Sequence, residues 1–385
     1  MFPRFTIKGM PHARAVYATT NQNSDALYLA RTHVPDAYVM MDLDGERIGI
    51  FNALEANRMR TQSAIGTVLP LEEYCEKAKT AFGAANPGPG DILALLARER
   101  RLVTVEVGSD FPALVLRQAE RRGLLFEVAE GPLFPERRIK SDAEAREIRK
   151  GNAASSAGFA AIEKILGEAT VADNGTLILN GEVLTSERVI TEIEIACLRA
   201  GAWATETIFA CGEQACDPHC EGSGPLRANK LIVADIFPRL DKSGYYGDMS
   251  RTYLKGTPSD DQKKLVDTVA EGQKMAFPMI RNGADGRAIH MAVSEFFASK
   301  GFPTTIRDGR NVGFFHGLGH GVGLDIHEAP RMNRSGSPLA AGMVVTVEPG
   351  LYYPEIGGCR IEDVVRVSDD GCEMLSEHPY DWVIR

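Results

Sequence analysis

The sequence contains no long hydrophobic run, which limits where the protein is expected to act. No stretch approaches the roughly 18 consecutive apolar residues of a membrane span. The first residues also lack the apolar core of a secretory signal. We therefore expect a cytoplasmic protein without a membrane partner.

Cysteine and positive charge are also scarce. The seven cysteines are an odd number without the spacing of a disulfide framework, which predicts reduced thiols. The formal net charge of −9 argues against a nucleic-acid partner, because binding to phosphates needs a basic surface. What remains is the composition of an ordinary globular protein, with 44% hydrophobic and 25% charged residues.

The C-terminal half contains five candidate metal ligands, each in a segment marked by glycine or proline. They are Asp235, Asp248, His320, Glu348 and Glu362. Four carboxylates and one imidazole are too many for a tetrahedral zinc site. They suit two adjacent divalent ions that share bridging carboxylates and keep positions open for water. This set predicts hydrolytic chemistry.

The two aspartates are expected on neighbouring strands. Residues 231–234 and 245–254 are β-prone runs on either side of a turn, which predicts a hairpin. Side chains across such a pair come within roughly 5 Å of each other, close enough for Asp235 and Asp248 to hold one ion. Taken singly, each Asp is more typical of a turn or a solvated surface. The prediction depends on the whole set.

Three of the eight histidines lie within one Gly-rich segment, at His316, His320 and His327. The interleaved glycines disfavour a helix and let the backbone approach a ligand closely. A dinucleotide loop is a weaker interpretation, because no G-x-G-x-x-G motif opens a helix here. A zinc site at Cys211, Cys216, His219 and Cys220 is weaker too, because these residues lack paired C-x-x-C spacing.

The two glutamates are expected at sheet positions. Residues 344–347 and 360–367 have strand composition, and the residues between them supply bends. A buried carboxylate on a strand is costly unless it is paired or binds a metal, which favours Glu362 as a ligand. An ion pair between Arg360 and Glu362 on an exposed strand face remains the alternative.

A domain boundary is expected near residue 140. The segment 131–138 resembles a linker, and Ser141 with Glu144 forms a capping box that opens a helix to about residue 166. Before it, predicted strands at 37–41, 48–51 and 103–107 alternate with helices at 72–82 and 111–122. After it come helices at 186–199, 259–280 and 285–300. We predict an α/β domain over residues 1–140 and an α+β domain over residues 141–385.

Four motifs in order, GYYGDMSRT, HGLGHGVGLDIHE, EPGLYY and GCRIED, resemble the pita-bread metallopeptidase family of methionine aminopeptidase, aminopeptidase P and prolidase. The resemblance covers residues 150–367. It implies that the five candidate ligands bind two metal ions, commonly manganese, cobalt or zinc, with Asp248 and Glu362 bridging. It also implies a creatinase-like or prolidase-like N-terminal domain and a homodimer.

The resemblance further implies roles around the metals. His219 would lie near the scissile bond, while His316 and His327 would contact substrate and stabilise the oxyanion. Arg360 would help to position substrate. Glu348 would act as general base and acid toward a metal-bridging hydroxide. The implied activity is cleavage of Xaa-Pro bonds in short proline-containing peptides, by a dipeptidase or an aminopeptidase.

Two departures from the family pattern keep other functions open. Phe237 stands where the family usually has glycine, and Asp248 follows Asp235 by 13 positions, two more than usual. Ser250 replaces the usual threonine but keeps the hydroxyl. Alternative functions on this fold are an ectoine-type amide hydrolase, a dimethylsulfoniopropionate-type lyase, metal-free creatinase chemistry and a non-catalytic binding module.

Overall fold

The computed structural model describes residues 12–385. The expectation that no secretory signal is present depends on the first residues, most of which lie outside this range. Contacts within the chain divide it into two compact units, residues 1–137 and 138–385. Of the helices described, none has the length and apolar character needed to cross a membrane.

The first unit contains a mixed six-stranded sheet in the order β4-β3-β2-β1-β5-β6. β1 pairs antiparallel with β2 and parallel with β5. The strands are β1 (Ala13–Ala18), β2 (Tyr38–Leu43), β3 (Glu46–Phe51), β4 (Thr67–Pro70), β5 (Thr104–Val107) and β6 (Leu125–Val128). The helices are α1 (Ser24–Ala30), α2 (Ala53–Gln62), α3 (Leu71–Phe82), α4 (Pro89–Glu99) and α5 (Ala113–Glu120). The predicted α/β class of this unit is confirmed.

Helix α4 is not expected from the local sequence, because Gly88, Pro89 and Gly90 are typical of a loop. The structure uses Pro89 within the first turn, where proline needs no hydrogen-bonded N–H. Residues 92–97 are all buried in the core of this unit. Burial of this apolar stretch therefore outweighs the loop-like start.

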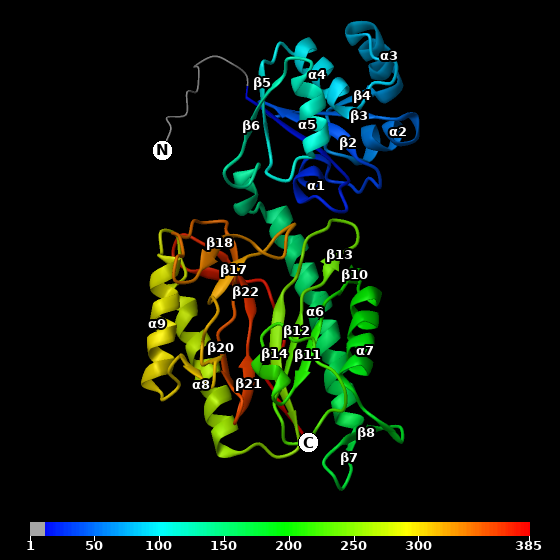
Figure 1. The fold of residues 1–385 in the computed structure, drawn as a ribbon. Helices are drawn as coiled ribbons and strands as arrows, with labels where there is room; N and C mark the ends of the chain where they lie inside the picture. The colour runs from blue at the N-terminus through cyan, green and yellow to red at the C-terminus, as the bar shows by residue number, and fades with distance from the viewer. Residues whose placement is uncertain (1–11) are drawn as a thin grey trace. The chain divides into compact units, whose positions relative to one another are not determined.

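In the second unit, strands lie between the helix pairs α6/α7 and α8/α9 (Figure 1). These helices are α6 (Asp142–Glu168), α7 (Ser186–Arg199), α8 (Asp260–Ala276) and α9 (Gly286–Ser299). Helix α6 begins at the predicted capping box, with Ser141 and Glu144 bonded to each other's backbone N–H groups. Helix α8 ends four residues before its predicted end and continues as a short 3-10 turn over Phe277–Met279, because Pro278 has no N–H to extend the α-helical hydrogen bonds.

The strands of the second unit form several small sheets. One four-stranded sheet has the order β11 (Ile208–Cys211), β12 (Ile232–Ile236), β14 (Met249–Lys255) and β24 (Val383–Ile384). A five-stranded sheet has the order β18 (Glu328–Met332), β17 (Gly319–Gly321), β19 (Val344–Val347), β22 (Asp363–Val367) and β23 (Cys372–Met374). Smaller sheets pair β20 (Gly350–Tyr353) with β21 (Gly357–Arg360), β10 (Ala202–Trp203) with β13 (Arg239–Leu240), β15 (Thr305–Arg307) with β16 (Arg310–Val312), and β7 (Thr170–Val171) with β8 (Leu177–Leu179) and β9 (Glu182–Val183).

The two runs that carry the aspartates pair antiparallel, but their predicted bounds are partly wrong. β14 begins at Met249, so residues 245–248 lie outside the ladder, and Ser250 is the residue opposite Asp235. Gly247 packs so closely on α6 that a Cβ there would lie 2.1 Å from the carbonyl carbon of Gly151. This contact between two backbones holds the segment against the helix instead of in the sheet.

The predicted strand over residues 360–367 is also wrong, because the chain changes sheets within it. β21 ends at Arg360 and pairs with β20, whereas β22 begins at Asp363 and pairs with β19. Glu362 lies in this break. Glu348 lies in the matching break between β19 and β20. Both glutamates are therefore placed where two adjacent chain segments pass from one sheet to another.

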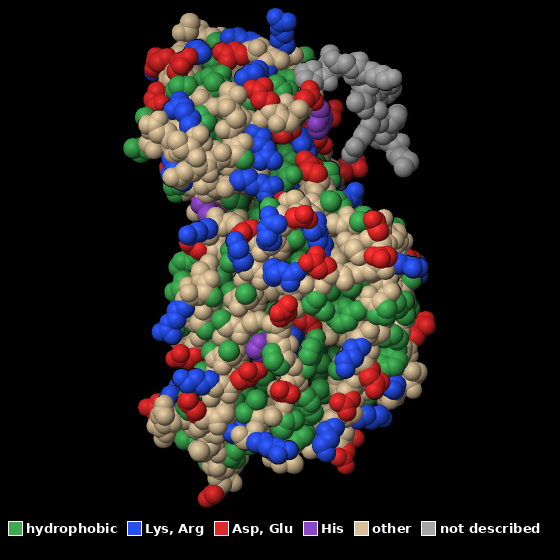
Figure 2. Space-filling model, turned by 180° about the vertical axis from the view of Figure 1, so that it is seen from behind, with side chains coloured by type: hydrophobic (Ala, Val, Ile, Leu, Met, Phe, Trp, Pro, Cys, Tyr) green, Lys and Arg blue, Asp and Glu red, His purple; other side chains and the backbone are tan. Residues whose placement is uncertain are grey.

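Acidic and basic side chains are interspersed over the face shown in Figure 2. Neither sign forms a large continuous patch among the described residues on that face. The absence of a nucleic-acid partner stays a prediction from the net charge.

Candidate metal centre

Two of the five predicted ligands lie on strands of the second unit, Asp235 on β12 and His320 on β17, and the other three lie directly beside strand ends. Asp248, His320 and Glu362 converge most closely, with one ligand atom from each lying within 4.8 Å of the others. His320 Nε2 lies 3.6 Å from Asp248 Oδ2 and 3.4 Å from Glu348 Oε1. This is the one such group found among residues 12–385, and it includes no cysteine. All seven cysteines are free thiols.

Asp235 borders this group and leaves one oxygen unsatisfied. Its Oδ2 accepts a hydrogen bond of 2.8 Å from Arg360 Nη2, while its Oδ1 is buried without a partner. Buried polar atoms in proteins are nearly always paired. An unpaired carboxylate oxygen at this position therefore fits a site built to hold a cation.

The buried carboxylates of this centre repel one another in the absence of metal. Burial raises the pKa of Asp248 and of Glu362 well above the ordinary range, and the neighbouring carboxylates raise both further. Burial, opposed by Arg360 and assisted by Asp235, raises the pKa of Glu348 to about 7. Divalent cations relieve such repulsion. The donor set, hard oxygens with one imidazole, therefore fits divalent ions.

His320 presents a lone pair to the carboxylates. Its Nδ1 lies 3.1 Å from the carbonyl oxygen of Gly321, so this nitrogen carries the proton. Burial lowers the pKa of His320 to about 3 and keeps the ring neutral. Nε2 is then free to bind a metal, with its orientation fixed by the bond at the other nitrogen.

Arg360 is buried beside the centre, and this overturns the exposed ion pair with Glu362 that the sequence left open. The side chain is 4% exposed, and its ionic partner is Asp235. Its Nε donates to Ser250 Oγ at 2.9 Å, and Ser250 Oγ donates in turn to Glu362 Oε2 at 2.7 Å. Arg360 thus connects to Glu362 through a hydroxyl.

His316 has a side chain that is 20% exposed, and both of its ring nitrogens have partners within the protein. Its Nδ1 is 2.8 Å from the Gly317 oxygen, and its Nε2 is 2.9 Å from the Tyr352 hydroxyl. Arg360 Nη1 donates to the same hydroxyl at 2.9 Å. Burial lowers the pKa of His316 to about 3. Both ring nitrogens are occupied, so in this conformation His316 supports Tyr352 and Arg360.

Residues 146–369 match metallopeptidase family M24. The chain belongs to this family. The predicted resemblance to the pita-bread metallopeptidase family and the predicted fold are therefore confirmed.

Relatives of this chain include an Xaa-Pro dipeptidase of Pyrococcus furiosus, 31% identical over 223 residues. That match covers 56% of this chain and 61% of the relative, so the chain spans about three fifths of that relative's length. The solved Xaa-Pro dipeptidase of Bacillus anthracis has a TM-score of 0.79 at 23% identity, covering 97% of this chain and 95% of the other. The X-Pro aminopeptidase of Thermotoga maritima has a TM-score of 0.78 at 21% identity, covering 96% and 97%.

The exposed side of the M24 centre carries His219, His327 and Arg331. The His327 ring lies 4.4 Å from the His320 ring. Burial lowers the pKa of His327, and the charges of Arg331 and His219 lower it further. Arg331 also helps to lower the pKa of His320. The Arg331 side chain makes no hydrogen bond or ion pair with any residue of 12–385.

Arg331 was not among the residues expected from the sequence. It is the cross-strand partner of His320 in the pair β17–β18. A bulge after His320 shifts this pairing, so the sequence contained no local signal for it.

Proposed function

We propose that this M24 metallopeptidase hydrolyses Xaa-Pro bonds with two divalent ions held by Asp235, Asp248, His320, Glu348 and Glu362. The main support is that buried carboxylates, which repel one another, converge on a neutral imidazole. In addition, Asp235 Oδ1 is buried without a partner. The names of the Xaa-Pro relatives support the substrate class. Bridging by Asp248 and Glu362, and manganese as the native metal with cobalt or zinc as alternatives, follow from the family resemblance.

The bound ions would polarise the scissile carbonyl and lower the pKa of a water molecule toward neutrality. Glu348 is the proton carrier. Its Oε1 accepts a hydrogen bond from Thr346 Oγ1 at 3.3 Å, so we assign the mobile proton to Oε2. This atom takes a proton from the attacking water and delivers it to the leaving prolyl nitrogen.

The two exposed histidines act on the substrate side. His327, beside the His320 ring, donates to the oxyanion as negative charge develops there. His219 assists protonation of the leaving nitrogen. We assign His316 an indirect role, in which it orients Tyr352 and through it Arg360.

Arg331 favours a dipeptidase over an aminopeptidase. A dipeptide ends in a carboxylate one residue beyond the scissile bond, and a free guanidinium is suited to bind it. A longer peptide has an amide at that position. The homodimer, the cytoplasmic location and the creatinase-like domain over residues 1–140 stay predictions from the sequence.

The function is tested by measuring proline release from Xaa-Pro dipeptides and cleavage of Xaa-Pro-Yaa tripeptides. Manganese-loaded protein is compared with protein treated with a chelator. We expect chelator-sensitive cleavage of the dipeptides. Preference for the tripeptides would assign an aminopeptidase instead. Absence of cleavage with every peptide would refute the peptidase proposal and bring the amide-hydrolase and lyase alternatives forward.

A further inference from the structure

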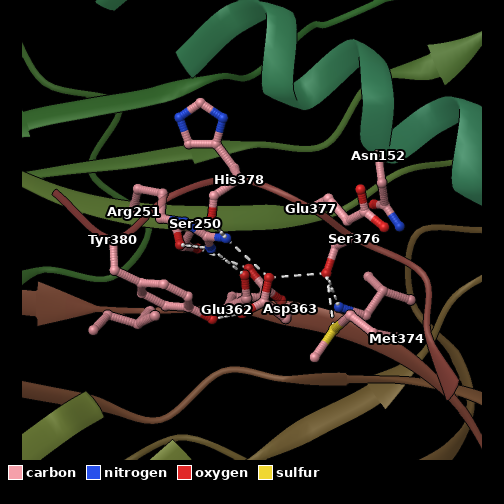
Figure 3. A network of polar contacts seen from close by, with 12 residues as sticks. Asn152, Ser250, Arg251, Glu362, Asp363, Met374, Ser376, Glu377, His378 and Tyr380 are labelled. Carbon is pink, nitrogen blue, oxygen red and sulfur yellow. Dashed lines mark hydrogen bonds and ion pairs between the residues drawn. The ribbon is translucent and has the colours of Figure 1, made fainter. Parts of the chain in front are cut away.

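A second polar network lies beside β14 and β22, the strands that follow Asp248 and Glu362 (Figure 3). Its centre is the pair Arg251 and Asp363, whose closest N–O distance is 2.9 Å. Each follows a residue of the metal centre, Ser250 or Glu362. Since successive side chains on a strand point to opposite faces, Arg251 on β14 faces away from the metal centre, and Asp363 lies with it on that side.

All five N–H groups of Arg251 donate hydrogen bonds within the protein. Nη1 donates to the backbone oxygens of Ser250 at 2.9 Å and Glu362 at 2.7 Å. The other donors reach Asp363 Oδ1 at 2.9 Å and the oxygens of His378 at 2.9 Å and Pro379 at 3.3 Å. A guanidinium has no further donor. Arg251 therefore connects the Glu362 peptide to the C-terminal segment 376–380.

Asp363 collects four donors in this network. Arg251 and Ser376 Oγ, the latter at 2.8 Å, donate to Oδ1. Gln273 Nε2, at 3.1 Å, and the Tyr380 hydroxyl donate to Oδ2. Figure 3 shows Ser376 and Tyr380 on opposite sides of this carboxylate. Two of the four donors thus belong to the C-terminal segment.

Gln273 extends the network to the peptide before each glutamate ligand. Its Nε2 lies 3.0 Å from the oxygen of Val347 and 3.3 Å from the oxygen of Ile361. Its Oε1 lies 3.1 Å from the Tyr380 hydroxyl. One side chain on α8 therefore contacts the residues directly before Glu348 and Glu362, and the C-terminal segment contacts that side chain.

These contacts fall where regular sheet structure is missing. Glu348 and Glu362 lie outside strands, at the two breaks between sheets. Repulsion among the buried carboxylates acts on the same segments. A metal site needs its ligands held close to their binding geometry before the ion arrives. At these breaks the polar network can supply that restraint.

We propose that Asp363 and the C-terminal segment 376–380 position the metal-binding glutamates, acting through Arg251 and Gln273. Tyr380 and Ser376 are then positioning residues for metal affinity, although neither faces the metals. The inference rests on the proposed metal site, and the experiment below tests that site separately.

The test compares Tyr380→Phe with Tyr74→Phe in the full chain. Each change removes one phenol hydroxyl bonded to a carboxylate, and Tyr74 donates to Glu99 in the first unit. Manganese affinity of chelator-treated protein is measured by calorimetry, and stability of the same protein by urea unfolding. We expect Tyr380→Phe to weaken manganese binding by about 10-fold, at the lower end of the effect of outer-sphere partners. Tyr74→Phe should bind as the unchanged protein does.

Ser376→Ala provides an independent variant and should weaken binding in the same direction. Equal manganese affinity in the unchanged protein, Tyr380→Phe and Ser376→Ala would overturn the positioning role, whatever the urea midpoints. If Tyr380→Phe does not fold, Ser376→Ala decides alone. Failure of the unchanged protein to bind manganese, cobalt and zinc would instead refute the metal site itself.

Discussion

Glu362 and Asp363 are adjacent and each is only 2% exposed, yet their surroundings are opposite. Burial raises the pKa of Glu362, and the charges of the neighbouring Asp248, Glu348 and Asp235 raise it further. Asp363 faces one guanidinium and three uncharged donors. Burial by itself does not distinguish a ligand from a structural carboxylate. The balance of charges and donors around it does.

The same contrast separates the arginines. Arg251 uses every donor to hold the backbone and Asp363. Arg360 donates hydrogen bonds to Asp235 and to the hydroxyls of Ser250 and Tyr352. Arg331 has no partner among the described residues. Of these three arginines only Arg331 has unpaired donors, which is why we propose that it recognises the substrate carboxylate.

The largest expected effect is that of Glu362→Gln, which keeps the shape but removes one repelling charge. Manganese binding should weaken by more than about 100-fold, beyond the range for residues outside the ligand sphere. The metal-free variant should nevertheless unfold at higher urea than the unchanged protein, because repulsion is relieved. Calorimetry and urea unfolding measure the two effects. Lower stability of the metal-free variant than of the unchanged protein would contradict the contrast between Glu362 and Asp363.

Asp363→Asn should have the opposite effect on stability. It removes the charge that balances buried Arg251, and breaking a buried ion pair in this way costs about 3–5 kcal/mol. Urea unfolding of metal-free protein gives the value. Asp91→Asn serves as control, since its partner Arg122 has a side chain 29% exposed and the loss should be smaller. Equal losses at the two positions would contradict the contrast.

Arg331→Gln tests whether Arg331 binds the carboxylate of a dipeptide substrate. Loss of a charge-assisted hydrogen bond costs about 1.5–3 kcal/mol, so KM for Xaa-Pro dipeptides should rise about 10- to 100-fold. Initial rates against concentration separate KM from kcat. Xaa-Pro amides lack the carboxylate and serve as control substrates. A similar rise in KM for the amides would exclude recognition of the carboxylate.

The smallest effect at any one step of a titration is the pH dependence of the metal-free protein. The pKa of Glu348 is raised from its ordinary 4.5 to about 7 in the fold. Between these values Glu348 binds more protons in the folded state than in the unfolded state, so its contribution to stability should fall as pH rises from 4.5 to 7, whereas His316 and His320, whose pKa is lowered to about 3, contribute with the opposite sign. The slope is at most about 1.4 kcal/mol per pH unit for each proton. Glu348→Gln should remove this contribution, so the unchanged protein should lose stability relative to the variant as pH rises. An equal pH dependence of urea stability in the two proteins would contradict the assignment.

Local sequence patterns predicted much of the fold. The capping box at Ser141 and Glu144 gave the start of α6, and the bounds of α7 and β19 were predicted correctly. These features depend on residues a few positions apart, whose side chains cap a helix or alternate on a strand. α4 was missed because its proline and glycines are typical of loops, while its burial depends on distant strands.

The sequence by itself determined which side chains are available for the metal centre. Asp235, Asp248, His320, Glu348 and Glu362 were named from residue type, order and motif, since hard oxygens and an imidazole carry their chemistry wherever they are placed. Only the tertiary structure decided that Arg360 pairs with Asp235, that Arg331 lies opposite His320, and that Glu362 and Asp363 serve different networks. The physical reason is that these contacts join segments far apart in the chain, and packing of sheets and helices brings them together.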